Sequence, residues 1–489
     1  MKKTLSLSGL TINAMALIAP GAFLWLTYEL QAAQVDPSGT STAPDIWTGL
    51  FLALILSFLT AASYAWLSRR YPDAGAGSSY YFAQRALLDR GSSNKTARNA
   101  KFIVGWLSHL YYWVYPGVMV AMMGFFITYI LSTVGIIISP LTEVAIVIAF
   151  AVVVGFIAFR GINGSTRTNL MINIAQIGML IGVTGVALAY RFLNPQHVTF
   201  YYSNPTSIVV PSNAAHVLFQ ATIAILVLVG FESVTALTGE AKNPKDVPKA
   251  IILSLVIQGV FCYLLEYYGM QAWINSKYTF PAAAASNSPI GDMIIRSING
   301  LFGGGGFIVM LVVAAIVAVA ILGTTLSCMN TGVRVTYAIS RDSEVPEPLG
   351  KLNLRYGTPA IGVWVLTLVT AGIGSFGVLS LTNLSAITYL SNFGTFMLYG
   401  VTCLIAVYAL SKEKRSIVTK YVVPFAGLAA NAVMMIAVIW LATIGGGSTQ
   451  LAGLIAVAAV GLWMAAGLIY YLWNSRSTES RIFPFPGGK

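Results

Sequence analysis

About twelve long apolar stretches constrain this chain most, because a run of about 20 apolar residues can cross a bilayer as a helix. Spans are predicted near residues 7–30, 46–68, 102–131, 141–159, 168–190, 211–238, 248–270, 304–332, 358–380, 384–410, 420–443 and 450–473. Only 9% of the residues are charged, whereas soluble domains carry about 25% charged residues. The chain is therefore predicted to be an all-α polytopic membrane protein.

The basic residues predict the orientation of these spans. Of the 28 Lys and Arg residues, 25 lie before the first span, in alternate loops or in the C-terminal tail, and the other three are Arg191, Lys277 and Arg296. Loops rich in Lys and Arg face the cytoplasm, so both termini are predicted to be cytoplasmic. The same distribution argues against nucleic acid as the reason for the net charge of +12. We expect a multi-pass protein of the cell inner membrane or plasma membrane.

Two of the spans are interrupted midway. The first contains Pro20, which has no backbone N–H, followed by Gly21, which can leave helical geometry. The sixth contains Gly230 and, two residues later, Glu232, whose carboxylate is costly in hydrocarbon unless it faces a cavity or a partner. The alternative for the sixth span is a close helix-packing glycine beside a carboxylate bonded to neighbouring helices. Interrupted spans at corresponding positions in two halves of a chain are typical of transporter binding sites.

The span count allows two inverted repeats. Because five is odd, the first and sixth spans run in opposite directions, so spans one to five and six to ten can be related by inversion. The predicted division is 1–190 for the first repeat, 211–410 for the second, 420–473 for the last two spans and 474–489 for a cytoplasmic tail. No residue-level repeat is visible, and the symmetry depends on the two interruptions and the number of spans.

The half-helices at such breaks predict a site for a small zwitterion. N–H groups after a break suit a carboxylate, and carbonyls before a break suit an ammonium. Donors are expected around Gly21 and Ala22, and acceptors around Leu17, Ile18, Leu228 and Val229. Tyr115 is included as a pocket residue because it lies deep in the third span, although a stripe of aromatic residues more often serves packing or the membrane interface. The predicted substrate-binding residues are Leu17, Ile18, Ala19, Gly21, Ala22, Tyr115, Leu228, Val229, Gly230 and Phe231.

Glu232 is the predicted proton-coupling residue, because ionisable groups inside a membrane are functional by default. Its alternative role is that of a structural carboxylate. Glu29 and Glu266 fall toward the outer ends of their spans and are expected to line an entrance.

Other side chains suggest less specific chemistry. Thr324, Thr325 and Ser327 could offer hydroxyls to a sodium ion, although helix-packing hydroxyls are the commoner case. The three cysteines, Cys262, Cys328 and Cys403, lie in apolar segments and predict neither a disulfide framework nor a metal site. No cofactor and no catalytic constellation is predicted.

At this point the residues resemble the amino acid–polyamine–organocation superfamily. Gly230-Phe231-Glu232-Ser233 and Gly239-Glu240-Ala241-Lys242-Asn243-Pro244 look like that family's sixth-span signature, which is the specific part of the match. Pro72-Asp73-Ala74-Gly75 and Gly105-Trp106 are similar to its other landmarks, and the resemblance covers most of the chain. It implies a LeuT-type fold of five-plus-five inverted repeats with broken helices 1 and 6, and alternating access. It also implies that a substrate carboxylate binds first-span N–H groups, here Gly21 and Ala22, and that its amino group binds sixth-span carbonyls.

Two departures from the family pattern leave the coupling mechanism open. Many members have Gly-Ser-Gly at the first break, where this chain has Ala19-Pro20-Gly21. Proton-coupled relatives often have a lysine in the fifth span, where this chain offers Gln176, which cannot change charge. Coupling by protonation of Glu232, coupling by an ion such as sodium, and obligate exchange all remain open.

The favoured function is secondary transport of amino acids across the cytoplasmic membrane. The alternative substrates are polyamines or other amines, for which Glu29, Glu232 and Glu266 would supply counter-charge. A non-transporting membrane sensor and an intramembrane enzyme are further alternatives, opposed by the lack of an output domain and of a nucleophile–base constellation.

Overall fold

The structure is a computed structural model and describes residues 4–18, 24–72, 74, 77–161, 166–193, 198–414 and 416–477. These residues fold into helices and form no strand beyond isolated bridge pairs. The α-helices of the first ten spans and their connections are Leu7–Ile18 (α1), Leu24–Ala33 (α2), Ile46–Arg70 (α3), Ser79–Leu88 (α4), Asn94–Thr133 (α5), Pro140–Phe159 (α6), Thr166–Leu193 (α7), Ala214–Ala224 (α8), Val247–Leu255 (α9), Leu264–Trp273 (α10), Phe280–Ala284 (α11), Pro289–Phe302 (α12), Gly306–Arg341 (α13), Ala360–Val378 (α14) and Leu381–Leu410 (α15). The last two spans are Val423–Ile444 (α16) and Gly447–Ser477 (α17).

Eleven helical stretches of the described chain are long and apolar enough to cross a membrane. They coincide with the second to twelfth predicted spans, and α1 and α2 cover the first. The prediction of an all-α polytopic membrane protein is therefore confirmed. The predicted interruption at Pro20 and Gly21 falls on residues 19–23, outside the described residues, and stays a prediction.

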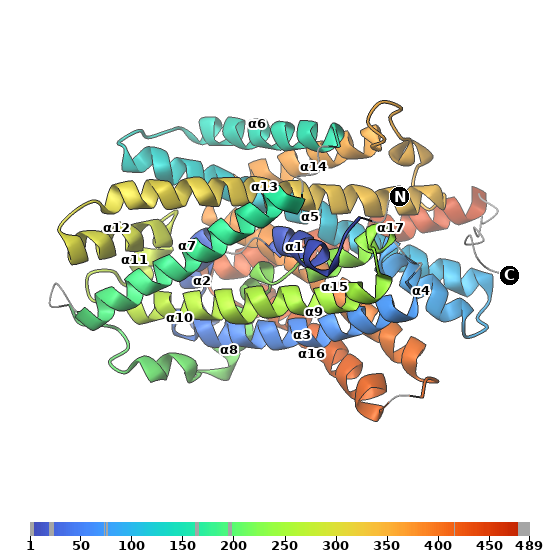
Figure 1. Cartoon of the computed structure of the whole chain (residues 1–489), viewed down its shortest axis with the longest axis horizontal. Helices are drawn as coiled ribbons and strands as arrows, with labels where there is room; N and C mark the ends of the chain where they lie inside the picture. The colour runs from blue at the N-terminus through green and yellow to red at the C-terminus, as the bar shows by residue number, and fades with distance from the viewer. Residues whose placement is uncertain are drawn as a thin grey trace.

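The helices run roughly along the long axis of the molecule (Figure 1). One end carries α4 and the end of α17, and the other carries α11 and α12; we call these the α4 end and the α12 end. On the orientation predicted from the basic residues, the α4 end faces the cytoplasm. The peripheral helices α6, α16 and α17 leave many apolar side chains exposed, as lipid-facing helices do.

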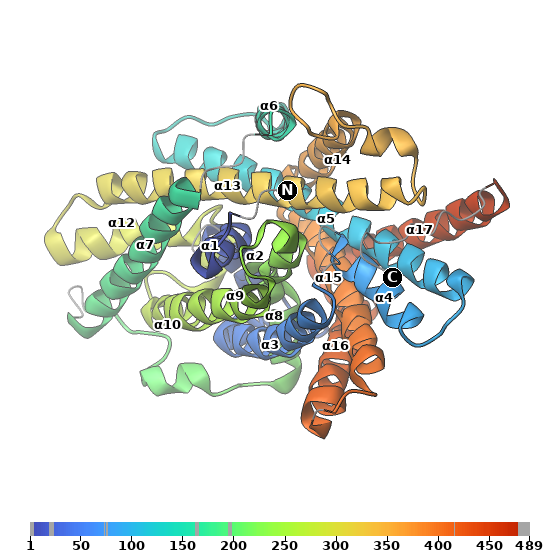
Figure 2. The same ribbon diagram turned by 45° about the vertical axis from the view of Figure 1, so that its right-hand side comes forward.

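The short helices α1 and α2, which lie on either side of residues 19–23, are inside the bundle. α1 packs on α7, α9 and α13, and α2 packs on α8, α11 and α12. Turned by 45°, the molecule shows α1 and α2 enclosed by α13, α7, α9 and α3 (Figure 2). α5 forms the opposite wall, where it packs on α13, α14 and α15. At Gly117 of α5 any side chain would collide with Ile373 of α14, so this glycine permits the close approach of the two helices.

The sixth span is broken, as predicted. α8 ends at Ala224, a 3₁₀ turn, η4, covers Ile225–Val227, and a second 3₁₀ segment, η5, runs from Phe231 to Glu240. Gly230 joins the two halves with φ of +127°, a conformation that side-chain-bearing residues rarely adopt. The chain therefore leaves helical geometry at the glycine that the sequence singled out.

A second irregularity follows in the seventh span. Between α9 and α10 the backbone forms a π-helix, η7, over Val256–Tyr263. Single π-helical turns are rare and are frequent at functional sites.

Candidate functional site

The break in the sixth span exposes backbone carbonyls in the middle of the bundle. The N–H groups of Leu228 and Val229 both turn back to the carbonyl of Ile225, at 2.9 and 3.2 Å. In the part of the chain that the structure describes, no hydrogen bond reaches the carbonyl oxygens of Leu228 and Val229. Both residues are completely buried. These two carbonyls are therefore available acceptors in a place where water is excluded, which suits a ligand with N–H donors.

Tyr115 fixes the turn from the side of α5. Its hydroxyl donates to the carbonyl of Leu226 at 3.2 Å, and the side chain is 1% exposed. The phenol therefore occupies an acceptor that precedes the two open carbonyls. This places Tyr115 beside the broken backbone of the sixth span.

Gly230 and Phe231 have different surroundings. The carbonyl of Gly230 accepts the N–H of Ser233 at 3.1 Å and its hydroxyl at 2.7 Å, so it is already used within the chain. The Phe231 ring packs on Tyr64 and Tyr399, with centroids 6.2 and 5.3 Å away. The side chain of Phe231 therefore packs against other aromatic rings next to the break and adds no polar group.

The carboxylate of Glu232 is surrounded by hydrogen-bond donors. Oε1 accepts from the hydroxyls of Tyr111 at 3.1 Å and Tyr112 at 3.4 Å. Oε2 accepts from the hydroxyl of Tyr399 at 2.7 Å and from the N–H of Gly230 at 3.1 Å. An ionised carboxylate is acceptor-only with about four lone-pair sites. Four donors match the ionised form of Glu232 without a neighbouring cation.

This cluster joins three elements across the bundle. Glu232 belongs to η5, Tyr111 and Tyr112 to α5, and Tyr399 to α15. The carboxylate therefore ties the second half of the broken span to two long helices. Hydrogen bonds to charged groups are about twice as strong as neutral ones, so the junction is a strong one.

Two glutamines hold the half-helices α2 and α8 together toward the α12 end. Gln34 of α2's C-terminal extension donates to the carbonyl of Phe219 at 3.0 Å and to the hydroxyl of Tyr389 at 2.9 Å. Gln220 of α8 donates in return to the carbonyl of Gln31 at 2.8 Å. All of these side chains are buried. The two half-helices are thus cross-linked to each other and, through Tyr389, to α15.

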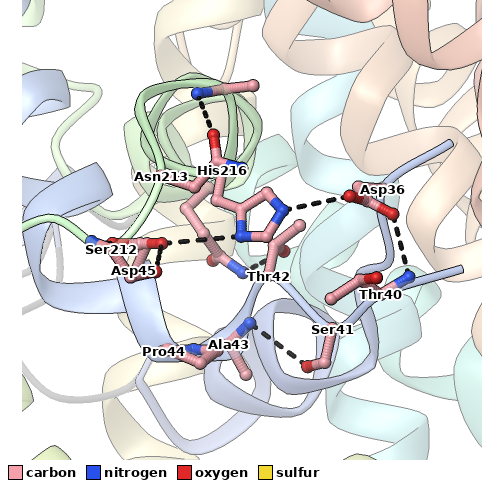
Figure 3. Close-up of polar contacts among 12 residues, drawn as sticks. Asp36, Thr40, Ser41, Thr42, Ala43, Pro44, Asp45, Ser212, Asn213 and His216 are labelled. Atoms are coloured by element: carbon pink, nitrogen blue, oxygen red, sulfur yellow. Dashed lines mark hydrogen bonds and ion pairs between the residues drawn. The ribbon is translucent and has the colours of Figure 1, made fainter. Parts of the chain in front are cut away.

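A charged cluster lies between the α2–α3 connection and the start of α8 (Figure 3). His216 of α8 places Nε2 3.1 Å from Asp36 and Nδ1 3.6 Å from Asp45. Asp45 also accepts the N–H of Ser212 at 2.7 Å. Burial works against ionisation of Asp36, but hydrogen bonds from Ser38, His216 and Thr40 outweigh it and lower its pKa to about 2. The cluster joins the connection between α2 and α3 to the start of α8.

Five of the ten predicted substrate-binding residues have both a described backbone and a described side chain. Tyr115, Leu228, Val229, Gly230 and Phe231 come together with Glu232 at the sixth-span break. The other five predictions fall at the predicted first break: the side chains of Leu17 and Ile18 are not described, and Ala19, Gly21 and Ala22 lie outside the described residues.

The sequence did not identify the donors around Glu232. Tyr111 and Tyr112 lie in the aromatic run that contains Tyr115, so a clustering of phenols one turn from Tyr115 was a usable signal. Tyr399 lies 167 residues from Glu232, and nothing around it in the sequence indicates the contact.

The hydroxyls considered for sodium are used in helix packing. Thr324 donates to the carbonyl of Ala16 at 3.2 Å, and Thr325 donates to the carbonyl of Ile321, one turn earlier in α13, at 2.7 Å. Within the described ranges no group of three or more His, Cys, Asp or Glu side chains could hold a metal ion. The hydroxyls of Thr324 and Thr325 therefore fit the packing alternative.

Comparison with known proteins finds similar proteins over most of the chain. The family model for amino acid permeases matches residues 3–475. The branched-chain amino acid permease BcaP of Bacillus subtilis is 24% identical over 97% of this chain and 94% of its own length. The low-affinity putrescine importer PlaP of Escherichia coli K12 is 24% identical over 99% of this chain and 96% of its own length. The methylthioribose transporter of Bacillus subtilis is 27% identical over about half of each chain, 55% of this one and 52% of its own.

Proposed function

The chain belongs to the amino acid permease family, and we propose that it is a secondary transporter that carries neutral amino acids across the membrane by alternating access. The family and the two full-length relatives support a membrane transporter of small molecules. The proposed organisation is that of two inverted repeats, residues 1–190 and 211–410, with both termini in the cytoplasm. Coupling to protons and obligate exchange are the two modes that we consider.

The observation that carries the proposal is the pair of open carbonyls at Leu228 and Val229. An ammonium group has three donors and no acceptor, so it is matched to carbonyl oxygens in a dry site. The substrate carboxylate is proposed to bind first-span N–H groups at Gly21 and Ala22. A ligand with both charges then neutralises both half-helix ends at once.

The hydrogen bonds that Glu232 already accepts favour a zwitterionic substrate over a diamine. A diamine has two cationic ends and needs counter-charge at both. The oxygens of Glu232 are already occupied by four donors from the protein. This carboxylate therefore offers no free acceptor to a second ammonium group in the conformation described.

Amine transport is the second candidate, and two observations favour it. The relative PlaP is a putrescine importer. Two further carboxylates, Glu29 and Glu266, are buried in this chain at 2% and 1% exposure. A substrate panel therefore has to include a diamine.

The proposed movement couples the two broken spans. α2 and α8 are cross-linked by Gln34 and Gln220, so they are proposed to move together at the α12 end. Glu232 ties the other half of the sixth span to α5 and α15. Alternating access would require these two sets of contacts to open in turn, because a protein site can expose its ligand to only one side at a time.

The experiment is uptake into liposomes that contain the purified full-length protein. We expect saturable uptake of labelled leucine, competition by other neutral amino acids and little competition by putrescine. Uptake and competition by putrescine alone would move the assignment to amines, and binding without uptake would favour a sensor.

A backbone variant links that activity to the break. Gly230→Ala forces a side chain into φ of +127°, which costs about 1–3 kcal/mol and displaces the open carbonyls. We expect this variant to lose leucine uptake. The matched control is Gly178→Ala on α7, because a Cβ at Gly178 meets nothing within 4 Å. Equal loss in both variants would disconnect the break from transport.

A further inference from the structure

Glu266 is a buried carboxyl group that the protein leaves without a partner. It lies in α10, one turn after the π-helix η7, and is 1% exposed. Neither Oε1 nor Oε2 has a hydrogen-bond partner, and no ion pair to it is formed among the described residues. Buried charges are normally paired and hydrogen-bonded, so a bare carboxylate would be an exception here.

The elements around α10 supply no cation to Glu266. α10 packs on η7, α7, α3 and a 3₁₀ turn, η3, at Pro205–Val209. Its Tyr267 also contacts α2, whose one charged residue is the acid Glu29. The titratable groups beside Glu266 are the thiol of Cys262 and the phenol of Tyr267. Tyr267 uses its hydroxyl elsewhere, with Thr27 at 3.0 Å and Gln31 at 2.7 Å.

The charged residue of α7 that approaches α10 is Arg191. Its guanidinium donates to the carbonyls of Ala272 and Tyr202, at 2.6 and 2.5 Å, more than one turn beyond Glu266. η3 has no charged residue, and α3 has none before Arg69 at its far end. These elements therefore offer no cation to Glu266, and the protonated carboxylic acid is the form that fits this place.

Glu266 also lies between two contacts to the first span. On one side, Gln258 of η7 donates to the carbonyl of Met15 near the end of α1, at 2.9 Å. On the other side, Tyr267 bonds Thr27 and Gln31 of α2. A movement of α1 against α2 would therefore act on the π-helical turn and on the surroundings of Glu266.

A second polar oxygen without a partner lies nearby. Thr184 of α7 packs on Gly269, about one turn along α10 from Glu266, and any side chain at Gly269 would come within 2.8 Å of the Thr184 methyl carbon. The Thr184 hydroxyl is buried and has no hydrogen-bond partner in the described structure. The interface between α7 and α10 thus contains a hydroxyl and a carboxyl group that are both free to bind or pass a proton.

We propose that Glu266 is a proton-binding site of the transport cycle. It holds a proton in the conformation described, and its O–H bond breaks when movement of the first span opens this interface to water, which takes the proton and leaves a carboxylate. The return step is protonation from water on the other side. The proposal rests on the proposed transport function and names Glu266, rather than Glu232, as the group that changes charge.

The test measures protons and substrate together in liposomes that contain the full-length protein. A trapped pH dye reports proton entry, and labelled leucine reports substrate entry. We expect leucine to bring protons with it in the wild type, and the ratio of protons to leucine to fall to background in Glu266→Gln. The matched control, Glu143→Gln, replaces a carboxyl group that accepts from Thr128 near the α12 end and should keep the wild-type ratio.

The outcomes separate this proposal from the transport function. A wild type that exchanges leucine without proton entry, or a Glu266→Gln protein with an unchanged ratio, would overturn the proton site and leave amino acid transport standing. If putrescine protects Glu266 from chemical modification, or if putrescine transport depends on Glu266, this residue would instead be identified as an amine ligand. A wild type that transports neither substrate would contradict the proposed function itself.

A second measurement needs no variant and does not depend on transport. Dicyclohexylcarbodiimide is apolar and modifies protonated carboxyl groups, and mass spectrometry locates the adduct. We expect an adduct on Glu266, decreasing as the pH rises, and none on Glu232. Modification of Glu232 with Glu266 unmodified would overturn the proposal.

Discussion

Glu232 and Glu266 lie in adjacent spans and are both buried, but they differ in the hydrogen-bond donors that the protein places around them. Glu232 is 0% exposed and receives four donors. Glu266 is 1% exposed and receives none among the described residues. Burial alone therefore says little about how a carboxyl group is used.

The difference follows from the backbone on which each residue lies. Glu232 follows a break, where the N–H of Gly230 is free to point at the carboxylate and phenols enter from α5 and α15. Glu266 lies within the helix α10, whose N–H groups bond within the helix. A broken helix can stabilise a charge, whereas a continuous helix in apolar surroundings favours the neutral acid.

The largest expected effect on stability comes from replacing each of these two glutamates by glutamine. In Glu232→Gln the new amide NH₂ faces the N–H of Gly230 or the phenols, which leaves a buried donor unsatisfied. We expect the unfolding free energy to fall by about 3 kcal/mol. In Glu266→Gln a neutral amide replaces a group that has no partner, and we expect little change in stability.

The measurement is the thermal unfolding of both purified variants in the same detergent. The wild type supplies the reference midpoint. A loss of stability in Glu266→Gln as large as that in Glu232→Gln would mean that Glu266 has a charged partner, and the contrast between the two sites would collapse.

The phenols of the Glu232 cluster allow a finer test. The Tyr399 hydroxyl is 2.7 Å from Oε2, and the Tyr112 hydroxyl is 3.4 Å from Oε1. Hydrogen bonds to charged groups contribute about 1.5–3 kcal/mol when they are short. We expect Tyr399→Phe to lose about 2 kcal/mol and Tyr112→Phe to lose little.

Unfolding midpoints of the two phenylalanine variants check this ranking. Each variant is the control for the other, because both remove one hydroxyl from the same buried cluster. A larger loss in Tyr112→Phe would show that Glu232 draws its stabilisation from Oε1 rather than from Oε2.

The sequence was sufficient for the spans and for the break in the sixth span. Length and apolarity located every long helix, since an apolar run of this length satisfies its own backbone hydrogen bonds in lipid as a helix. Gly230 was recognisable because a glycine two residues before a carboxylate is unusual inside an apolar segment. These features depend on local composition, which a single sequence contains.

The sequence separated Glu232 from Glu29 and Glu266 only by its depth in the span, and it did not distinguish Glu29 from Glu266. All three are single carboxylates in apolar runs, and the distinction depends on side chains from other helices. The donors to Glu232 come from positions 121 and 167 residues away. No periodicity in the chain marks such contacts, so Glu29 and Glu266 were expected at an entrance, whereas the structure buries both.

A third carboxylate, outside the membrane spans, gives the smallest expected effect and sharpens the comparison. Asp36 resembles Glu232 in its donors, since Ser38, Thr40 and His216 all bond it, but it lies in the connection between α2 and α3 near solvent. Burial works against its ionisation and these hydrogen bonds outweigh it, so its pKa falls to about 2. An unfolded Asp has a pKa of about 3.9. Because the folded value is the lower one, the stabilisation is complete above about pH 4 and is lost as the pH falls toward 2.

The stability difference between the wild type and Asp36→Asn should therefore shrink as the pH falls from about 4 to about 2, and remain constant above that range. Unfolding midpoints across this interval measure it, and Asp89→Asn, at a carboxylate that forms an exposed pair with Arg70, is the matched control. We expect the effect to be smaller than that of Glu232→Gln, because water can replace lost donors at Asp36 and cannot do so at Glu232. An Asp36 effect equal to that of Glu232 would mean that the number of donors, and not their isolation from water, sets the strength of such a site.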